Sequence, residues 1–241
     1  MALYRDHAVV LRSWKLGEAD RIISLHTHDH GKVRGVAKGV RRTKSKFGAR
    51  LEPLSHVSIQ LYRGRGDLDT ITQVETVDRF VTLREDSDRF ARAEAMLEAV
   101  DQVAQDREPD RGLHVMLVRA LRTLNERDSP LVVAAFFLKL LAHEGVQPEL
   151  DLCVECASRG PFAAFDFDDG GVRCDDCRRG RPISDGAISL MRRVLGGGLG
   201  GVLQEPVGPA TGEVDMLATA LLEHHLERRL RSVAVLDQHP H

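Results

Sequence analysis

Four cysteines place the tightest constraint on how this chain can fold, because they are its only cysteines and form two matched pairs. Both pairs have the spacing C-x-x-C, and 17 residues separate them. The four residues are Cys153, Cys156, Cys174 and Cys177. Two such turns can direct four thiolates to the corners of a tetrahedron, which Zn²⁺ prefers in structural sites. The spacing therefore predicts one structural zinc ion, bound by a four-cysteine element over residues 151–181.

Free thiols or disulfides are the alternatives to a metal. The N-terminal residues Met1 to Asp6 do not begin a secretory signal, and no apolar run is long enough to cross a membrane. We therefore expect a cytoplasmic protein, in which thiols stay reduced. Neither pair follows a strand and opens a helix, which argues against a thioredoxin-like redox role. Four sulfur ligands also leave no open position on a metal, so catalysis there is not expected.

Positive charge is concentrated in one segment, although the formal net charge of the chain is −2. Residues 32–50 hold eight basic residues and no acidic one. These are Lys32, Arg34, Lys38, Arg41, Arg42, Lys44, Lys46 and Arg50. The segment can be read as a solvated loop that aids solubility. Because eight like charges repel one another, we favour a polyanionic partner, and predict that these residues bind nucleic acid. The hydroxyls of Thr43 and Ser45 suit phosphate oxygens, and Phe47, the one aromatic residue among the charges, could stack on a base.

The first 80 residues predict a small β-barrel. Valine- and leucine-rich or alternating segments indicate five short strands. These are expected over residues 3–14, 21–28, 32–37, 56–62 and 68–77. The basic segment extends from the third strand into a long insertion before the fourth, where it can enlarge the binding face of a barrel.

Apolar residues recur at helical spacing from residue 86 onward. Ser87 is predicted to cap the first helix, Pro130 to open the third and Ser184 to cap the next. A glycine-rich stretch at 196–201 is expected to be a flexible connection, and the last helix to span 211–230. Strands followed by helices indicate an α+β multidomain fold: a barrel domain at 1–80, then an all-α domain at 81–241 that carries the zinc element.

Weaker signals are assigned structural roles. His26, His28 and His30 alternate and could share a metal, but they are better explained as a polar strand end that enters a turn. Asp166, Asp168 and Asp169 are expected at the solvated tip of the zinc hairpin, and His224 and His225 on a helix surface. The sequence has no Ser-His-Asp order and no metal-carboxylate signature. No catalytic residue is therefore predicted, and the protein is not expected to be an enzyme.

The sequence resembles the bacterial RecO family over essentially its whole length. The resemblance rests on five segments: Tyr4 to Trp14, G-E-A-D-R-I-I-S-L-H-T at 17–27 with the following Gly31, V-A-K-G-V-R-R-T-K-S at 36–45, L-E-P-L at 51–54, and the two C-x-x-C pairs. It implies that the barrel is a five-stranded OB-fold and that the helical domain contains the zinc element. All four cysteines of the pattern are present, which favours a retained metal.

The resemblance also implies a function in DNA repair and recombination, close to the nucleoid. It implies binding of single- and double-stranded DNA, annealing of complementary strands, and help in loading RecA onto strands covered by single-stranded DNA-binding protein (SSB). RecR and the SSB C-terminal tail are the implied protein partners. The tail needs a basic and apolar groove, for which the candidates by charge are Arg192, Arg193, Arg228, Arg229 and Arg231. The alternatives are a protein-docking adaptor with incidental DNA contact, and a zinc hydrolase or nucleotide-modifying enzyme.

Overall fold

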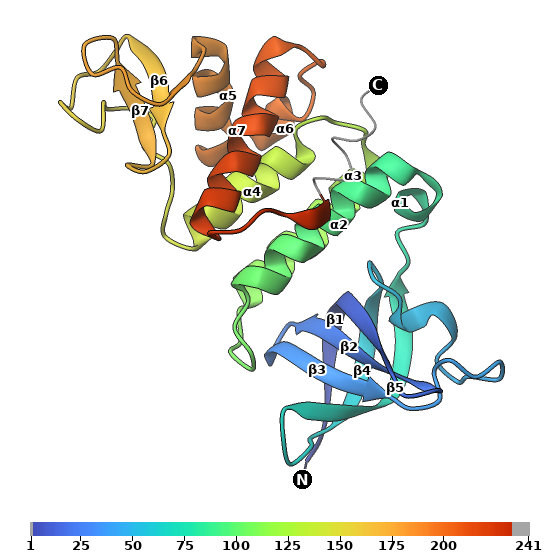
Figure 1. The fold of residues 1–241 in the computed structure, drawn as a ribbon. Coiled ribbons are helices and arrows are strands. Elements are labelled where there is room, and N and C mark those ends of the chain that lie inside the picture. Colours follow the sequence, from blue (N-terminus) through green and yellow to red (C-terminus); the bar gives the residue numbers. More distant parts are fainter. Residues whose placement is uncertain (1, 233–241) are drawn as a thin grey trace. The chain divides into compact units, whose positions relative to one another are not determined.

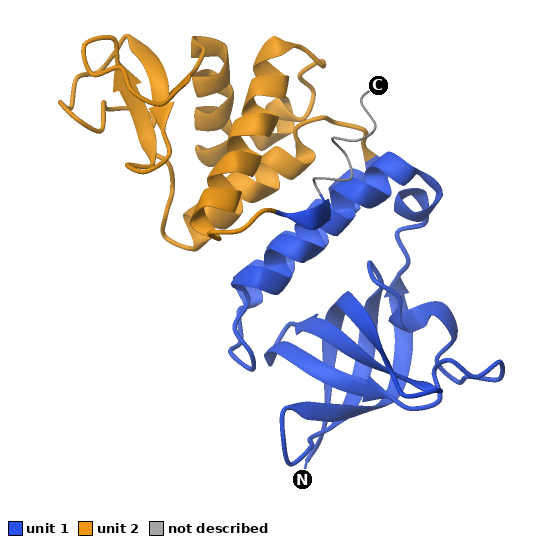
Figure 2. Ribbon diagram, in the orientation of Figure 1, with its two compact units in different colours: residues 1–126, 230–241 blue, residues 127–229 orange. Residues whose placement is uncertain are grey.

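The computed structural model describes residues 2–232 of the 241-residue chain (Figure 1). It contains two compact units, one formed by the chain through Glu126 together with the stretch from Leu230, and the other by Arg127–Arg229 (Figure 2). The barrel and the first three α-helices belong to the first unit. A domain boundary at residue 80 stays a prediction from the sequence. Within the described residues, no helix is both long and apolar enough to span a bilayer.

Five strands close into a barrel in the order β1-β2-β3-β5-β4, so that the predicted N-terminal barrel is confirmed. The strands are β1 (Leu3–Leu16), β2 (Asp20–Thr27), β3 (Gly31–Ala37), β4 (His56–Tyr62) and β5 (Leu68–Asp78). Neighbouring strands are antiparallel except β3 and β5, which are parallel. This is the topology of an OB-like fold. The segment between β3 and β4 contains a single turn of 3-10 helix, Gly48–Leu51.

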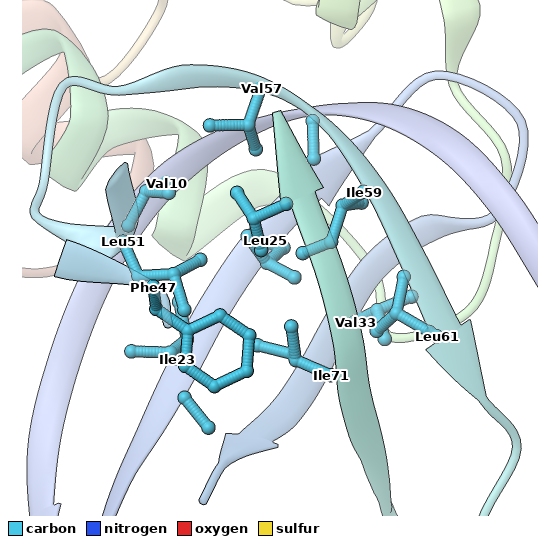
Figure 3. Close-up of a cluster of buried hydrophobic side chains, with 13 residues drawn as sticks. Val10, Ile23, Leu25, Val33, Phe47, Leu51, Val57, Ile59, Leu61 and Ile71 are labelled. Atoms are coloured by element: carbon cyan, nitrogen blue, oxygen red, sulfur yellow. The ribbon is translucent and has the colours of Figure 1, made fainter. Parts of the chain in front are cut away.

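The interior of the barrel is filled by aliphatic side chains from every strand, and by Phe47 from the segment between β3 and β4 (Figure 3). Alternation along β4 places Val57, Ile59 and Leu61 in this core, as the sequence pattern indicates. The register of β1 against β2 shifts between Val10 and Arg12, where β1 has a bulge. Beyond the bulge, the even-numbered residues of β1 lie on the outer face of the barrel, because Ser13 pairs with the core residue Ile23.

Three helices follow the barrel within the first unit: α1 (Val81–Glu85), α2 (Ser87–Val103) and α3 (Arg111–Glu126). The predicted cap of α2 is wrong by one residue. The carboxylate of Asp86, not Ser87, accepts hydrogen bonds from the backbone N–H groups of Asp88 and Arg89. A carboxylate reaches these groups readily, and its charge also suits the positive end of the helix.

The loop between α2 and α3 joins the edge of β3. The N–H of Lys32 donates to Gln105, and the carbonyl of Lys32 accepts from Arg107. Gly31 permits this close approach. Its φ is +68°, and a Cβ at this position would lie 2.0 Å from the carbonyl oxygen of Glu108. The glycine of the Asp-His-Gly turn therefore fixes the helical segment against the barrel, in addition to reversing the chain.

The second unit contains four helices and a small sheet: α4 (Val132–His143), β6 (Phe162–Asp166), β7 (Gly171–Cys174), β8 (Arg181–Pro182), α5 (Asp185–Leu195), α6 (Leu199–Val202) and α7 (Pro209–His225). Helix α4 is apolar on nearly all sides and packs against α5 and α7, as expected for a central helix. Ser184 caps α5 as predicted, since its hydroxyl accepts from the N–H of Ala187.

Two expectations for the second unit are wrong. The glycine-rich stretch is not only a connection, because it includes α6, whose residue Val202 is fully buried. The last helix ends at His225, and not at residue 230. Burial of Val202 stabilises α6, although its glycines disfavour a helix.

Candidate nucleic-acid interface and metal centre

The four cysteines converge as the spacing predicts. Their sulfur atoms all lie within 4.8 Å of one another. Cys153 and Cys156 belong to a turn that precedes β6, whereas Cys174 ends β7 and Cys177 lies in the turn that follows (Figure 1). No two of them are joined in a disulfide. The two C-x-x-C turns thus meet at one point, although 17 residues separate them in the sequence.

Backbone pairing brings the two turns together. The N–H of Val154 donates to the carbonyl of Val172, and the N–H of Val172 donates to Glu149, both at 3.0 Å. This pairing adds the segment before Cys153 to the edge of β7. Gly171 is required at the contact, because a Cβ there would lie 2.5 Å from a methyl group of Val154. The β6–β7 hairpin therefore positions the second cysteine pair and also carries the first.

The distances between the sulfur atoms fit a tetrahedral metal. Zinc–sulfur bonds of about 2.3 Å give a tetrahedron whose edges are about 3.8 Å. The Cys156 and Cys174 sulfurs are 3.7 Å apart. The residues present are thus a plausible metal site of the structural type, with four sulfur ligands and no oxygen or nitrogen ligand among them.

The surroundings of Cys153 favour the thiolate over the thiol. Burial opposes ionisation, but the backbone N–H groups of Cys156 and Cys174 point to its sulfur. Their combined effect lowers the pKa of Cys153 to about 6. Since metals bind the thiolate, these amide groups favour the state that a metal requires.

A buried arginine links the two cysteine turns. Arg173, which precedes Cys174, forms ion pairs with Glu155 of the first turn at 2.5 Å and with Asp166 of β6 at 2.8 Å. Its third partner is Asp169. Asp166 is only 3% exposed, so the expectation that it belongs to the solvated tip is wrong, while Asp168 and Asp169 do lie there. Arg173 is only 3% exposed, and its partner carboxylates neutralise a charge that would otherwise be buried without a partner.

Residues 38–50, which we call the basic loop, contain six of the eight predicted DNA-binding residues: Lys38, Arg41, Arg42, Lys44, Lys46 and Arg50. One end of this loop is attached to the hairpin turn between β1 and β2. The guanidinium of Arg41 donates to the carbonyl of Glu18 at 2.8 Å, and the N–H of Gly39 donates to the carboxylate of Asp20 at 2.7 Å. The loop therefore begins in a fixed position on the barrel.

The other end of the basic loop is anchored by Phe47, which is 2% exposed and packs in the barrel core (Figure 3). The prediction that Phe47 stacks on a base is therefore wrong. An aromatic ring flanked by charges gains more from burial in the open end of a barrel than from exposure to water. Lys46 extends from the same place and donates to the carbonyl of Thr72.

Three charged side chains of the basic loop remain exposed without a partner in the described part of the chain: Lys38, Arg42 and Lys44. Arg41, Lys46 and Arg50 are also exposed, but each donates to a backbone carbonyl and keeps its full charge. The loop thus presents positive charge with no acidic residue within it.

Lys32 and Arg34 lie on β3 and not on the loop. Arg34 forms an ion pair with Asp106 at 2.6 Å, and Lys32 lies 3.8 Å from the same carboxylate while it donates to the carbonyl of Asp101 at 2.8 Å. Asp106 belongs to the loop between α2 and α3, and no sequence pattern predicts that this loop lies beside β3. These two positive charges are therefore partly neutralised within the protein.

The histidines do not form the three-histidine metal group that was weighed as an alternative. Asp6 contacts the ring of His30 at 2.6 Å, while His26 is fully buried beside His114, 5.7 Å between ring centroids. Both ring nitrogens of His26 lack a hydrogen-bond partner among the described residues. Burial lowers the pKa of His26, His56 and His114 to about 4 each. Sequence reasoning missed this buried cluster, because His114 comes from a distant helix.

The five arginines weighed for a protein-tail groove have different surroundings. Arg192 pairs with Asp151 and Arg193 with Glu205, at 2.8 and 2.6 Å. Arg228 and Arg229 instead line a surface groove of about 460 Å³, with Phe167 and residues of α7. Arg231 belongs to the first unit.

Two family models match the chain and together cover nearly all of it. The model described as recombination protein O N terminal matches residues 1–80, which include the whole barrel. The model described as recombination protein O C terminal matches residues 84–234, from within α1 past the cysteine cluster.

Proposed function

Because the chain belongs to the recombination protein O family, we propose that it binds single- and double-stranded DNA and anneals complementary strands, and that with RecR it helps to load RecA onto SSB-coated DNA. Membership of this family implies a role as a mediator of DNA repair and recombination. Members are generally not catalysts, and annealing needs no catalytic residue. It needs two polyanions brought together while their repulsion is screened.

The observation that carries the proposal is the exposed charge of the basic loop, above all at Lys38, Arg42 and Lys44. Lysine and arginine that lack protein partners can neutralise phosphates and release counterions. The adjoining strands of an OB-like barrel provide the surface on which a nucleic-acid strand can lie. The ion pairs of Lys32 and Arg34 favour a smaller role for these two residues in the proposed interface.

A structural zinc ion is part of the proposal. Cys153, Cys156, Cys174 and Cys177 would hold it as thiolates, with Arg173 and its carboxylates bracing both turns. Bound there, the metal would supply folding energy to the hairpin and no open coordination position. This assigns the metal to the scaffold and excludes it from chemistry on DNA.

The groove beside Phe167 is our candidate for the SSB tail. Phe167 and Ala220 give it an apolar floor, and Arg228 and Arg229 can pair with acidic groups of a peptide. Glu223 and Glu227 also line it, so the arginines must reach past them. The groove and the basic loop have no residue in common.

Charge reversal tests the proposed DNA contact. Arg42→Glu with Lys44→Glu should abolish gel-shift binding of single- and double-stranded oligonucleotides at low ionic strength. The matched control reverses Arg119 and Arg127, which are exposed and lie outside the loop. If the loop variant binds DNA as the parent does, the interface is misplaced. If it loses DNA binding but keeps full RecA-loading activity, the adaptor alternative is favoured.

A further inference from the structure

Trp14 is the only tryptophan of the chain, and it lies on the outside of the barrel. It follows the β1 bulge and pairs with Ile22 of β2, which in turn pairs with Val36 of β3. None of these three residues belongs to the barrel core. The Trp14 side chain is 39% exposed. The outer faces of β1, β2 and β3 thus share an apolar row with one large aromatic ring.

The ring of Trp14 is held in place from one side. The guanidinium carbon of Arg12 lies 5.4 Å from the ring centroid, as in a cation–π contact. Arg12 is itself fixed, because it forms an ion pair with Asp101 of α2 at 3.5 Å. An aromatic surface that is already oriented loses little side-chain entropy when it binds a flat partner.

The basic loop and Trp14 share one structural support. The strand that carries Trp14 leads into the β1–β2 turn, and the loop is fastened to this turn through Ala19, Glu18 and Asp20. The N–H of Arg41 donates to Ala19 at 3.0 Å, in addition to the contacts of its side chain with Glu18. Lys38 directly follows β3, next to the apolar row. A chain with phosphates on the loop would therefore have its bases near the outer faces of β1 to β3.

The other aromatic side chains of the first unit fit this role less well. Phe47 is buried in the core, and the hydroxyl of Tyr4 donates to Asp69. Phe90 lies on α2 and not on a barrel strand. Tyr62 is as exposed as Trp14 but lies on β4, which is not adjacent to β2 or β3.

We propose that Trp14 stacks on an unpaired base of a DNA strand whose phosphates are held by the basic loop. The inference rests on the proposed function and adds a basis for selectivity. A single strand can present the flat face of a base to the ring, whereas a duplex keeps its bases stacked on one another. Trp14 should therefore contribute to binding of single-stranded DNA and contribute little to binding of the duplex.

The single tryptophan makes the test direct. The intact chain is titrated with oligothymidylate and with a blunt duplex of equal length. Emission of Trp14 is recorded beside the anisotropy of a labelled oligonucleotide. Oligothymidylate should quench the emission over the same concentrations that raise the anisotropy, and the duplex should quench it weakly. Trp14→Ala should weaken single-strand binding about ten-fold and leave duplex binding within about two-fold, since one stacked base contributes about 1–3 kcal/mol.

Trp14→Phe keeps an aromatic ring and should retain most of the affinity. Phe90→Ala, which removes a similarly exposed ring from α2, should leave both affinities unchanged. The inference is overturned if oligothymidylate binds by anisotropy without quenching, if the duplex quenches equally, or if Trp14→Ala binds single strands as the parent does. In those cases the proposed DNA binding stands. If no oligonucleotide changes its anisotropy at low salt, the result would instead contradict the proposed function together with the inference.

Discussion

The carboxylate of Asp69, fully buried on β5, forms an ion pair of 3.0 Å with the guanidinium of Arg107 in the loop after α2. The hydroxyl of Tyr4 and the N–H of Gly64 donate to the same carboxylate. Burial opposes ionisation of Asp69, but these donors together lower its pKa below the usual range. One acid thus joins β1, β5 and the helical segment within the first unit.

Removal of Arg107 should destabilise this unit strongly. Arg107→Met leaves the charge of Asp69 buried without its main partner, and we expect a loss of about 3 kcal/mol in the free energy of unfolding. Urea denaturation followed by circular dichroism measures it. Arg65→Met, which removes an exposed arginine from the β4–β5 loop, is the control and should change little. Equal midpoints for the two variants would show that the ion pair adds no stability.

The salt dependence of DNA binding should separate the loop from β3. If about half of the eight basic residues neutralise phosphates, the logarithm of affinity falls with the logarithm of salt concentration at a slope of about −3 to −4. Lys44→Ala should reduce the magnitude of this slope by about 1. Lys32→Ala should leave the slope almost unchanged, because Lys32 already contacts Asp101 and Asp106. The reverse ranking would place the interface on β3.

Removal of the metal should affect the second unit alone. We expect one zinc ion per chain with four sulfur neighbours in X-ray absorption. Cys156→Ser should lose the ion and the protection of the β6–β7 hairpin in hydrogen exchange, with ~10–16 kcal/mol as the upper limit of the lost folding energy. Asp176→Ser, a control in the same element, should retain both. A full complement of zinc in the Cys156 variant, or oxygen neighbours in the parent, contradicts a closed four-sulfur site.

Acid should destabilise the barrel unit through its buried histidines. The folded pKa values of His26, His56 and His114 are lowered by burial to about 4, against 6.5 when the chain is unfolded. All three are neutral in both states above about pH 7, so their contribution is complete there. As the pH falls from about 6.5 to 4, the unfolded state takes up protons that the folded state does not, and stability is lost.

His26→Leu tests the origin of this acid sensitivity. The variant removes two ring nitrogens that have no hydrogen-bond partner in the described residues, so its stability at pH 7 should stay within about 1 kcal/mol of the parent. Its loss of stability toward pH 4.5 should be smaller. His225→Leu, at the exposed end of α7, is the matched control and should keep the parent's profile. Hydrogen exchange at amides of the barrel strands measures the stability of the two variants as a function of pH, without interference from the metal site.

The strands and the cysteine cluster could be predicted from the sequence because their signals are local. Alternation defines β4, and the spacing of two C-x-x-C turns defines the cluster. Phe47 and Asp166 were misplaced for one shared reason. Each lies among polar residues in the sequence, but a distant group buries it: the barrel core for Phe47 and the guanidinium of Arg173 for Asp166.

The ion pairs of β3 could not be predicted from the sequence for a similar reason. Asp106 neutralises Arg34 across 72 positions of the chain, and no periodicity reports such a pairing. The same holds for His26 and His114, which meet only after α3 packs on the barrel. Trp14 offered a signal that could have been used: a lone tryptophan within alternating strand residues, in a chain with strong local positive charge.

The basic loop is attached to the barrel near both of its ends. Arg41 contacts the β1–β2 turn, and Phe47 packs in the barrel core. The residues from Arg42 to Ser45 lie between Arg41 and Lys46, which also contacts the barrel at Thr72. That span can therefore be replaced by other sequences without loss of the anchoring contacts. Changes in the length and charge of this span should alter the affinity for DNA. The contacts that attach the two ends of the loop to the barrel would remain.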